Sequence, residues 1–209
     1  MPKLYLLGGE NVFRRSAKGV NERAFRDAGD SAVVVVFSWA RASFDRKYQK
    51  RKLLTDYFIS LGASTINFID YSDSNETIAK KMADSNLVYL TGGLASILVE
   101  RLKTMGVDRL LHSYGGVIVG RSAGALALCR KCIITCRSNS KAKIISGLGL
   151  ADLTLKVHYK PEKDHALEKL SRQDKIYAVP EGSALIYNND VCSFIGEVYL
   201  FENGVKRML

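Results

Sequence analysis

Short apolar runs alternate, over the first 120 residues, with segments whose apolar residues repeat at helical spacing. The runs are residues 4–7, 32–37, 66–69, 87–90 and 117–119, and the helical spacing is clearest at residues 46–61, 76–83 and 95–105. Apolar runs of this length are typical of strands that are buried on both faces of a parallel sheet, with crossover helices between them. The pattern predicts an α/β fold with a parallel central sheet.

The chain changes character after about residue 130, where Ser, Thr and Lys separate short apolar pieces. These pieces are residues 143–155, 175–179, 184–187 and 198–201. They predict added, partly antiparallel strands that extend the same sheet. Because no linker, repeat or low-complexity tract interrupts the 209 residues, we expect residues 1–209 to form a single domain.

The composition disfavours a membrane protein, an exported protein and a nucleic-acid partner. No segment approaches the ~20 apolar residues of a membrane span, and the first residues lack a secretory signal, so we expect a cytoplasmic protein without a membrane partner. The formal net charge is +10, but the basic residues are spread along the chain and no nucleic-acid motif interleaves them with aromatic residues. A nucleic-acid partner is therefore disfavoured, whereas a homodimer stays open.

Three of the four cysteines, Cys129, Cys132 and Cys136, stand close together and raise the question of a metal site. Neither a second CxxC pair nor a nearby pair of histidines completes a set of four zinc ligands. The segment also alternates with Ile, as a packed element would. We interpret these residues as small buried thiols and expect neither a metal nor an organic cofactor.

Glycines follow three of the predicted strands, at Gly8-Gly9, Gly92-Gly93 and Gly120. In an open α/β sheet, ligands bind at the carboxyl ends of the strands. We expect the chemistry of this protein to lie along that edge.

The segment GRSAGA at residues 120–125 lies between a buried strand, 115–119, and the start of a helix, 123–129. In this setting G-x-S-x-G indicates a nucleophile elbow, a strained turn that exposes a serine hydroxyl and needs small neighbours. The alternative is a plain glycine-rich turn. We predict that Ser122 is a nucleophile.

A serine nucleophile needs a base, and the chain has three histidines. His112 lies at a predicted helix end, where a histidine stabilises the helix dipole, and His165 lies among charged residues on a predicted surface helix. His158 follows an apolar strand and is the better candidate, although it could instead be an interior histidine whose hydrogen bonds are satisfied.

The base in turn needs an orienting carboxylate. Glu181 is the acid that stands in an apolar, turn-forming frame downstream of the histidines, in the segment VPEGS. Asp152, which begins the strand leading to His158, and Glu162, which follows Pro161, are its competitors. Glu181 could also be a simple turn residue.

Four segments, namely GRSAGA, the TGG at residues 91–93, the VHY at residues 157–159 and PEGSAL at residues 180–185, together resemble the serine peptidase family of aspartyl dipeptidase and cyanophycinase. The resemblance covers most of the chain in the same order. It implies a fold similar to class I glutamine amidotransferases, a three-layer α/β sandwich with a mostly parallel central sheet. It also implies a serine in place of the amidotransferase cysteine.

The resemblance implies roles for five residues. Ser122 is similar to the family nucleophile, His158 to its base and Glu181 to its acid. Gly93 and Ala123 are similar to the residues whose backbone N–H groups form the oxyanion hole, which gives the bare backbone at residue 93 a chemical reason. A further acid proposed about fifteen residues after the serine has no match, because Thr135, Cys136 and Arg137 stand there.

Two departures from the family concern the substrate. Leu94 stands where the family usually has Asn, and Lys160, Lys163 and Lys169 stand where Arg residues are expected after the histidine. A lysine balances a carboxylate but lacks the bidentate fork of arginine, so the preference for an acidic substrate is open. The candidate substrate contacts are Leu94, Arg121, Tyr159 and Lys160.

The sequence thus predicts a serine hydrolase that cleaves a small peptide through a Ser-His-Glu triad and an acyl-enzyme. Two alternatives remain. One is a catalytically impaired family member that acts as a binding protein, and the other is an esterase or amidase on a non-peptide acyl group.

Overall fold

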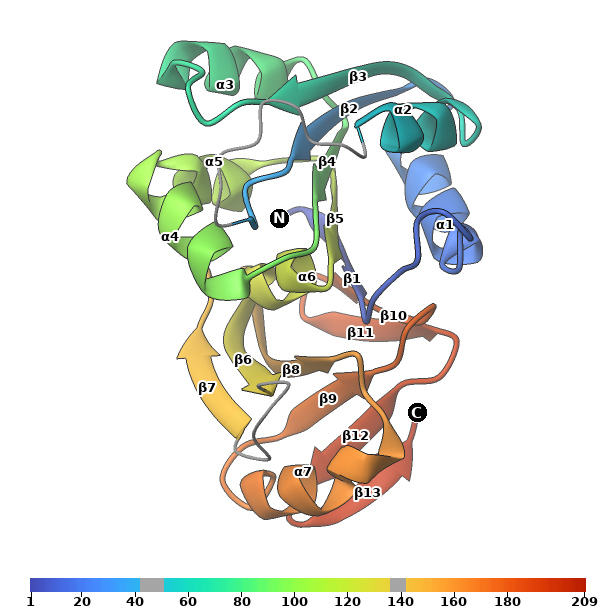
Figure 1. Ribbon diagram of the computed structural model, residues 1–209, viewed down its shortest axis with the longest axis vertical. Coiled ribbons are helices and arrows are strands. Elements are labelled where there is room, and N and C mark those ends of the chain that lie inside the picture. Colours follow the sequence, from blue (N-terminus) through green and yellow to red (C-terminus); the bar gives the residue numbers. More distant parts are fainter. Residues whose placement is uncertain (42–50, 136–141) are drawn as a thin grey trace.

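A seven-stranded sheet forms the upper part of the computed structural model, which describes residues 1–41, 51–135 and 142–209 (Figure 1). Its strand order is β11-β10-β1-β5-β4-β2-β3. Strands β1 to β5 are mutually parallel, while β10 and β11 add an antiparallel edge, so the predicted mostly parallel sheet is confirmed. The strands are β1 (Lys3–Leu7), β2 (Ala32–Phe37), β3 (Ala63–Ile69), β4 (Leu87–Leu90), β5 (Val117–Arg121), β10 (Ala184–Asn188) and β11 (Val191–Ile195).

Helices cover both faces of this sheet and complete three layers. Apolar side chains of α1 and α2 pack on one face, and those of α3, α4, α5 and α6 pack on the other. The predicted helices at residues 76–83 and 95–105 match α3 and α4, whereas residues 46–50 of the third predicted helix lie outside the described residues. No helix in the described ranges is both long and apolar enough to cross a membrane. The helices are α1 (Lys18–Ala28), α2 (Arg51–Ile59), α3 (Asn75–Ala83), α4 (Ala95–Thr104), α5 (Val107–Ser113) and α6 (Ala123–Leu128).

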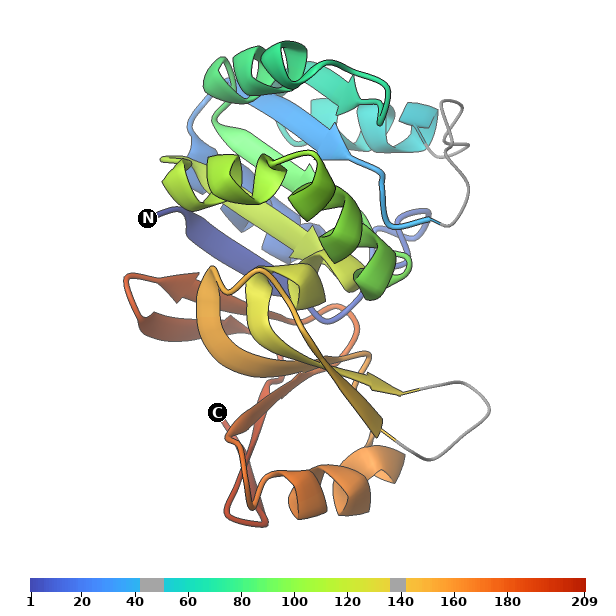
Figure 2. The same ribbon diagram turned by 90° about the vertical axis from the view of Figure 1, so that its left-hand side faces the viewer.

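A second sheet, absent from the sequence-based expectation, lies below the first (Figures 1 and 2). Its order is β13-β12-β9-β8-β6-β7, and the short helices η1 and α7 belong to the same half of the molecule. Of the apolar pieces expected to extend the first sheet, only residues 184–187 do so, and the other three belong to the second sheet. The elements are β6 (Cys129–Thr135), β7 (Ala142–Ser146), β8 (Ala151–Val157), η1 (Pro161–Lys163), α7 (Asp164–Leu170), β9 (Ile176–Val179), β12 (Tyr199–Glu202) and β13 (Val205–Met208).

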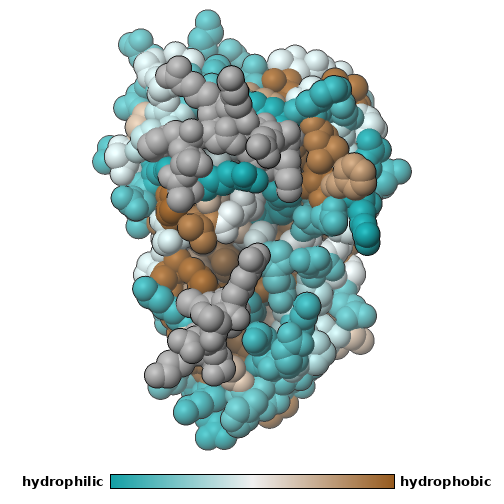
Figure 3. All heavy atoms as spheres, viewed as in Figure 1, coloured by the Kyte–Doolittle hydropathy of each residue, from teal (hydrophilic) through white to brown (hydrophobic). Residues whose placement is uncertain are grey.

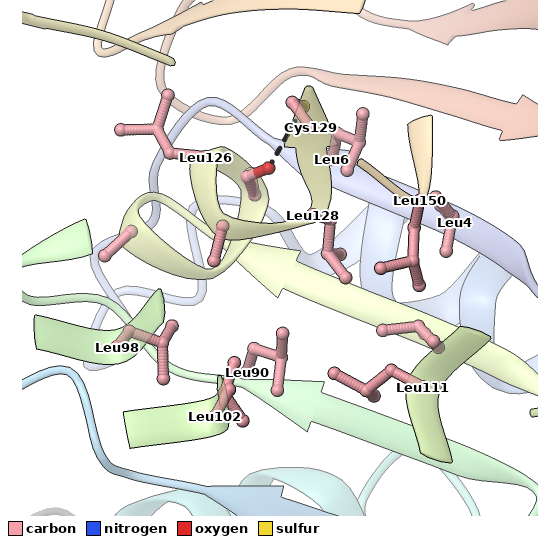
Figure 4. Packing of buried hydrophobic residues seen from close by; sticks show 14 of the residues in the cluster. Leu4, Leu6, Leu90, Leu98, Leu102, Leu111, Leu126, Leu128, Cys129 and Leu150 are labelled. Atoms are coloured by element: carbon pink, nitrogen blue, oxygen red, sulfur yellow. Dashed lines mark hydrogen bonds between the residues drawn. The ribbon is translucent and has the colours of Figure 1, made fainter. Parts of the chain in front are cut away.

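Helix α6 joins the two sheets. Leu126 and Leu128 of α6 pack into the same core cluster as Leu4 and Leu6 of the first sheet (Figure 4). Leu155 of the second sheet belongs to this cluster too. Helix α6 has six residues and is buried throughout, and the chain that leaves it enters β6 of the second sheet. The residue before α6 therefore lies where the two sheets meet.

The cysteines near this junction are buried thiols, as expected. Cys129 and Cys132 are fully buried, and their Sγ atoms donate to the carbonyl oxygens of Ala125 and Leu126. Burial raises the pKa of both thiols, that of Cys132 to about 12. Cys136 lies outside the described residues. Over the part of the chain that is described, no group of three or more His, Cys, Asp or Glu residues is placed to hold a metal ion.

Candidate active site

Ser122 occupies a sharp turn between β5 and α6. Its backbone dihedral angles are φ 53° and ψ −106°, a region that side chains rarely adopt, and its N–H donates to Leu7 O over 3.1 Å. The glycines on either side are required by close approach. A Cβ atom at Gly120 would lie 2.6 Å from Ala125 N, and one at Gly124 would lie 2.3 Å from Leu90 O. The close approach of Gly120 to the start of α6 and of Gly124 to β4 thus explains why G-x-S-x-G has these small residues.

A chain of hydrogen bonds runs from Ser122 to an acid. Ser122 Oγ lies 2.7 Å from His158 Nε2, and His158 Nδ1 lies 2.9 Å from Glu181 Oε1. The three residues come from the end of β5, the end of β8 and the turn between β9 and β10. The side chains of His158 and Glu181 are 45% and 60% exposed, so the site is open to solvent. This is the arrangement that a serine nucleophile, a base and an orienting carboxylate would require.

The other candidate bases and acids lie elsewhere. His112 Nδ1 contacts Asp108 O within α5, and His165 is an exposed residue of α7. Asp152 lies at the opposite end of β8 from His158 and pairs with Arg130. Glu162 is exposed in η1.

The loop after β1 holds the site together, a role that the sequence did not assign to it. Gly8 O accepts a hydrogen bond from His158 N over 2.7 Å, and Gly8 N donates to Ser183 O over 3.0 Å. Gly9 O accepts from Gly182 N over 3.0 Å. The two glycines therefore position both His158 and the turn that carries Glu181.

Gly9 is packed directly against the base. A Cβ atom at this position would lie 2.4 Å from Cε1 and 2.6 Å from Nδ1 of His158, and 3.0 Å from Cγ of Glu181. Contacts under 3.0 Å require something to move. Only a glycine leaves room for the hydrogen-bonded His158–Glu181 pair.

We expect Gly9→Ala to lower kcat/KM for peptide hydrolysis by about 10²-fold, because a displacement of about 1 Å of the base costs that much. Steady-state kinetics on a dipeptide would measure it. Gly29→Ala is the matched control, since Gly29 also has a positive φ of 105° but no atom within 4 Å of the added Cβ. Equal activities of the two variants would contradict the prediction.

The backbone N–H groups of Gly93 and Ala123 are the two that the sequence assigned to an oxyanion hole. A Cβ atom at Gly92 would lie 3.4 Å from Ser122 Cβ, so the segment that contains Gly93 runs beside the serine. Ala123 follows Ser122 as the first residue of α6, where N–H groups have no partner within the helix. Among the described residues, neither Gly93 N–H nor Ala123 N–H donates to a backbone carbonyl. Both are available to an oxygen placed beside Ser122.

The candidate substrate contacts differ in exposure. Leu94 is 55% exposed directly after Gly93, and Lys160 is exposed two residues after His158. Arg121 is only 6% exposed, with its Nε 3.7 Å from the position that a Gly92 Cβ would take. Leu94 and Lys160 are therefore the accessible members of the set.

Tyr159 is a core residue, and the expectation that it contacts substrate is corrected. It is 4% exposed, its ring packs on Tyr199 at 4.9 Å, and its hydroxyl donates to Asp164 over 2.5 Å. Burial, followed by the hydrogen bond to Asp164, raises its pKa to about 12. The physical reason is that the ring of Tyr159 packs into the apolar cluster of the second sheet, against Tyr199 and Phe201.

Lys156 is a buried cation two residues before His158. It is 5% exposed, and its Nζ donates to Val157 O over 2.8 Å. Burial, with a smaller contribution from the charge of Lys163, lowers its pKa to about 8. The native state therefore releases this proton more readily than the unfolded chain.

We expect the free energy of unfolding to rise between about pH 8 and 10.5 through Lys156, because the unfolded chain binds the extra proton in this range. The gain from pH 7.5 to 10 is about 2 kcal/mol. Urea unfolding of the wild type and of Lys156→Met across this range would measure it. A stability difference between the two proteins that stays constant with pH would refute the prediction.

Comparison with known proteins places these observations in a family. The model of peptidase family S51 matches residues 40–195, a range that contains Gly93, Ser122, His158 and Glu181. No curated protein matches the chain in sequence.

Two solved structures share the fold. The crystal structure of a peptidase from an acI-B1 actinobacterium is 18% identical, with a TM-score of 0.72 over 100% of this chain and 94% of that chain. A candidate peptidase E from Listeria monocytogenes EGD-e is 20% identical, with a TM-score of 0.70 over 93% of this chain and 98% of that chain. These likenesses confirm the α/β fold, and the family match over most of the chain shows that the protein belongs to peptidase family S51 and is a peptidase.

Proposed function

We propose that this chain cleaves small peptides through an acyl-enzyme formed on Ser122. The observation that supports the proposal most strongly is the continuous hydrogen-bond chain from Ser122 Oγ through His158 to Glu181. Ser122 is the nucleophile, His158 the general base and Glu181 the group that orients the imidazole and stabilises its charged form.

In the first half of the reaction, Ser122 Oγ attacks the peptide carbonyl carbon while its proton moves to His158 Nε2. The carbonyl oxygen becomes an oxyanion, which accepts hydrogen bonds from the N–H groups of Gly93 and Ala123. The C–N bond then breaks, and His158 donates its proton to the departing amine. The products of this half are the free amine and an ester on Ser122.

In the second half, a water molecule attacks the ester carbon and gives a proton to His158. The same two N–H groups hold the second oxyanion. The bond to Ser122 Oγ breaks, and His158 returns the proton to the serine. The sum is the hydrolysis of one peptide bond, with the enzyme unchanged.

A fluorophosphonate probe tests the proposal, because it reacts with activated serines. We expect labelling of the wild type at Ser122, and hydrolysis of dipeptides by the same preparation. Ser122→Ala should show neither, whereas Ser113→Ala, which removes an exposed hydroxyl in α5, should show both. Absence of label on wild-type Ser122, or undiminished hydrolysis by Ser122→Ala, would reject the mechanism.

The same experiment separates the two alternatives. A binding protein on this scaffold would neither take up the label nor hydrolyse any substrate. An esterase or amidase would take up the label but hydrolyse short acyl esters or amides in preference to every dipeptide.

A further inference from the structure

Leu94 exposes an apolar side chain two residues after Gly92, which packs beside Ser122. It is 55% exposed, while Ala95 after it is 5% exposed and Thr91 before the two glycines is 1% exposed. It follows Gly93, and a Cβ atom at Gly92 would lie 3.4 Å from Ser122 Cβ. In Figure 3, hydrophobic surface borders the left-hand side of the hollow in the middle of this face. A single exposed leucine is common on protein surfaces, so the exposure of Leu94 alone indicates no function.

The backbone at Leu94 is held in place. Its N–H donates to Ala40 O over 2.6 Å, and its carbonyl accepts the first hydrogen bond of α4, from Leu98 N over 3.1 Å. The preceding Gly93 is packed so closely that a Cβ atom there would lie 2.2 Å from Ala40 O. The exposed side chain is therefore presented from a fixed position.

The side chain of Leu94 does not cap α4. Leu94 is the N-cap residue, and it makes no side-chain hydrogen bond to the helix. Asn, Asp, Ser and Thr stabilise this position by accepting a hydrogen bond from the first turn, whereas Leu is among the poorest residues there. An exposed residue that is also a poor N-cap departs from the residue preferences of a helix start, and such departures are expected at functional sites.

From these observations we infer that Leu94 forms an apolar subsite and that this peptidase favours substrates with an apolar side chain next to the cleaved bond. The inference rests on the proposed function, since it places the substrate between Ser122 and Gly93. An apolar side chain in that place removes the exposed surface of Leu94 from water. A carboxylate or amide in the same place would lose water without gaining a partner from Leu94.

A set of dipeptides with Leu, Asn or Asp on either side of the bond, each paired with Ala, tests the inference. Leu and Asn have similar shapes, so their comparison isolates polarity. For the wild type we expect kcat/KM for the Leu dipeptide to exceed that for the Asn dipeptide by about tenfold at one of the two positions, the usual scale for a small apolar contact. In Leu94→Asn the ratio should fall to about twofold or less.

Thermal unfolding provides a second measurement, in which Leu94→Asn is expected to gain stability although it loses the substrate preference. Because Asn is a good N-cap, Leu94→Asn should raise Tm by about 2–4 °C while it loses the substrate preference. Ile59→Asn is the matched control, since Ile59 is 59% exposed at the end of α2 and should keep the wild-type ratio. A lower Tm for Leu94→Asn would assign Leu94 to folding and overturn the inference.

The outcomes distinguish this inference from the proposed function. If Ser122 takes up the probe and dipeptides are hydrolysed, but the Leu to Asn ratio is the same in the wild type and in Leu94→Asn, only the subsite is refuted. A preference of the wild type for the Asp dipeptide would likewise refute only the subsite. If Ser122 takes up no label and no dipeptide is hydrolysed, the mechanism and the subsite are both refuted.

Discussion

His158→Gln is expected to lower kcat for peptide hydrolysis by about 10⁵-fold, close to the loss caused by removing the nucleophile itself. His158 Nε2 lies 2.7 Å from Ser122 Oγ, and glutamine cannot accept the serine proton. Without that transfer Ser122 attacks as a neutral hydroxyl, and the leaving amine receives no proton. The variant should keep its affinity for peptides, so the loss should appear in kcat and not in KM.

His165→Gln is the matched control for this prediction. His165 lies on α7, and sequence reasoning weighed it as an alternative base. Its replacement should leave kcat within about twofold of the wild type, the scale expected for a surface substitution. A large loss in His165→Gln, or a small one in His158→Gln, would place the base elsewhere.

Glu181→Gln is expected to lower kcat by about 10³-fold. Replacing the acid of a buried triad by its amide costs about 10⁴-fold, because the acid no longer holds the imidazole in the correct tautomer or stabilises its protonated form. The side chain of Glu181 is 60% exposed, so water replaces part of the lost interaction and we expect a smaller effect. Steady-state kinetics would measure the loss, again in kcat.

Glu162→Gln removes a carboxylate that lies in η1, near in sequence to His158 but without a contact to it among the described residues. Its kcat should match that of the wild type. If Glu162→Gln impairs hydrolysis as strongly as Glu181→Gln does, the acid has been assigned to the wrong residue.

Local patterns in the sequence were sufficient to predict the central layers of the fold and the sharp turn at Ser122. Apolar runs such as residues 32–37 are too short for a helix and apolar enough to be buried on both faces, so they specify strands without help from the rest of the chain. The small residues of the GRSAGA segment were likewise recognisable in the sequence, and the contacts of Gly120 and Gly124 explain why they are small. The contact of Gly120 with Ala125 is local in sequence, whereas the contact of Gly124 with Leu90 joins distant segments.

The pairing of the strands could not be predicted from the sequence. The pieces at residues 143–155 and 184–187 have the same short apolar character, yet the first joins the second sheet and the other pairs with β1. A strand pattern tells which residues are buried but not which edge supplies the partner. That choice is seen only in the structure, where β8 pairs with β6 and β10 returns to the first sheet to pair with β1.

The role of the β1 loop was also decided by the tertiary structure. Gly8 and Gly9 were visible in the sequence as glycines at the end of a strand, which is a signal for a binding edge. Nothing in the sequence shows that residues nearly 150 positions downstream pack on them, as His158 does. The sequence by itself determined the parallel strands of the first sheet, helices such as α3 and α4, and the turn at Ser122, because these depend largely on neighbouring residues. Only the tertiary structure determined how the base and the acid are brought to Ser122, because that depends on contacts between distant segments.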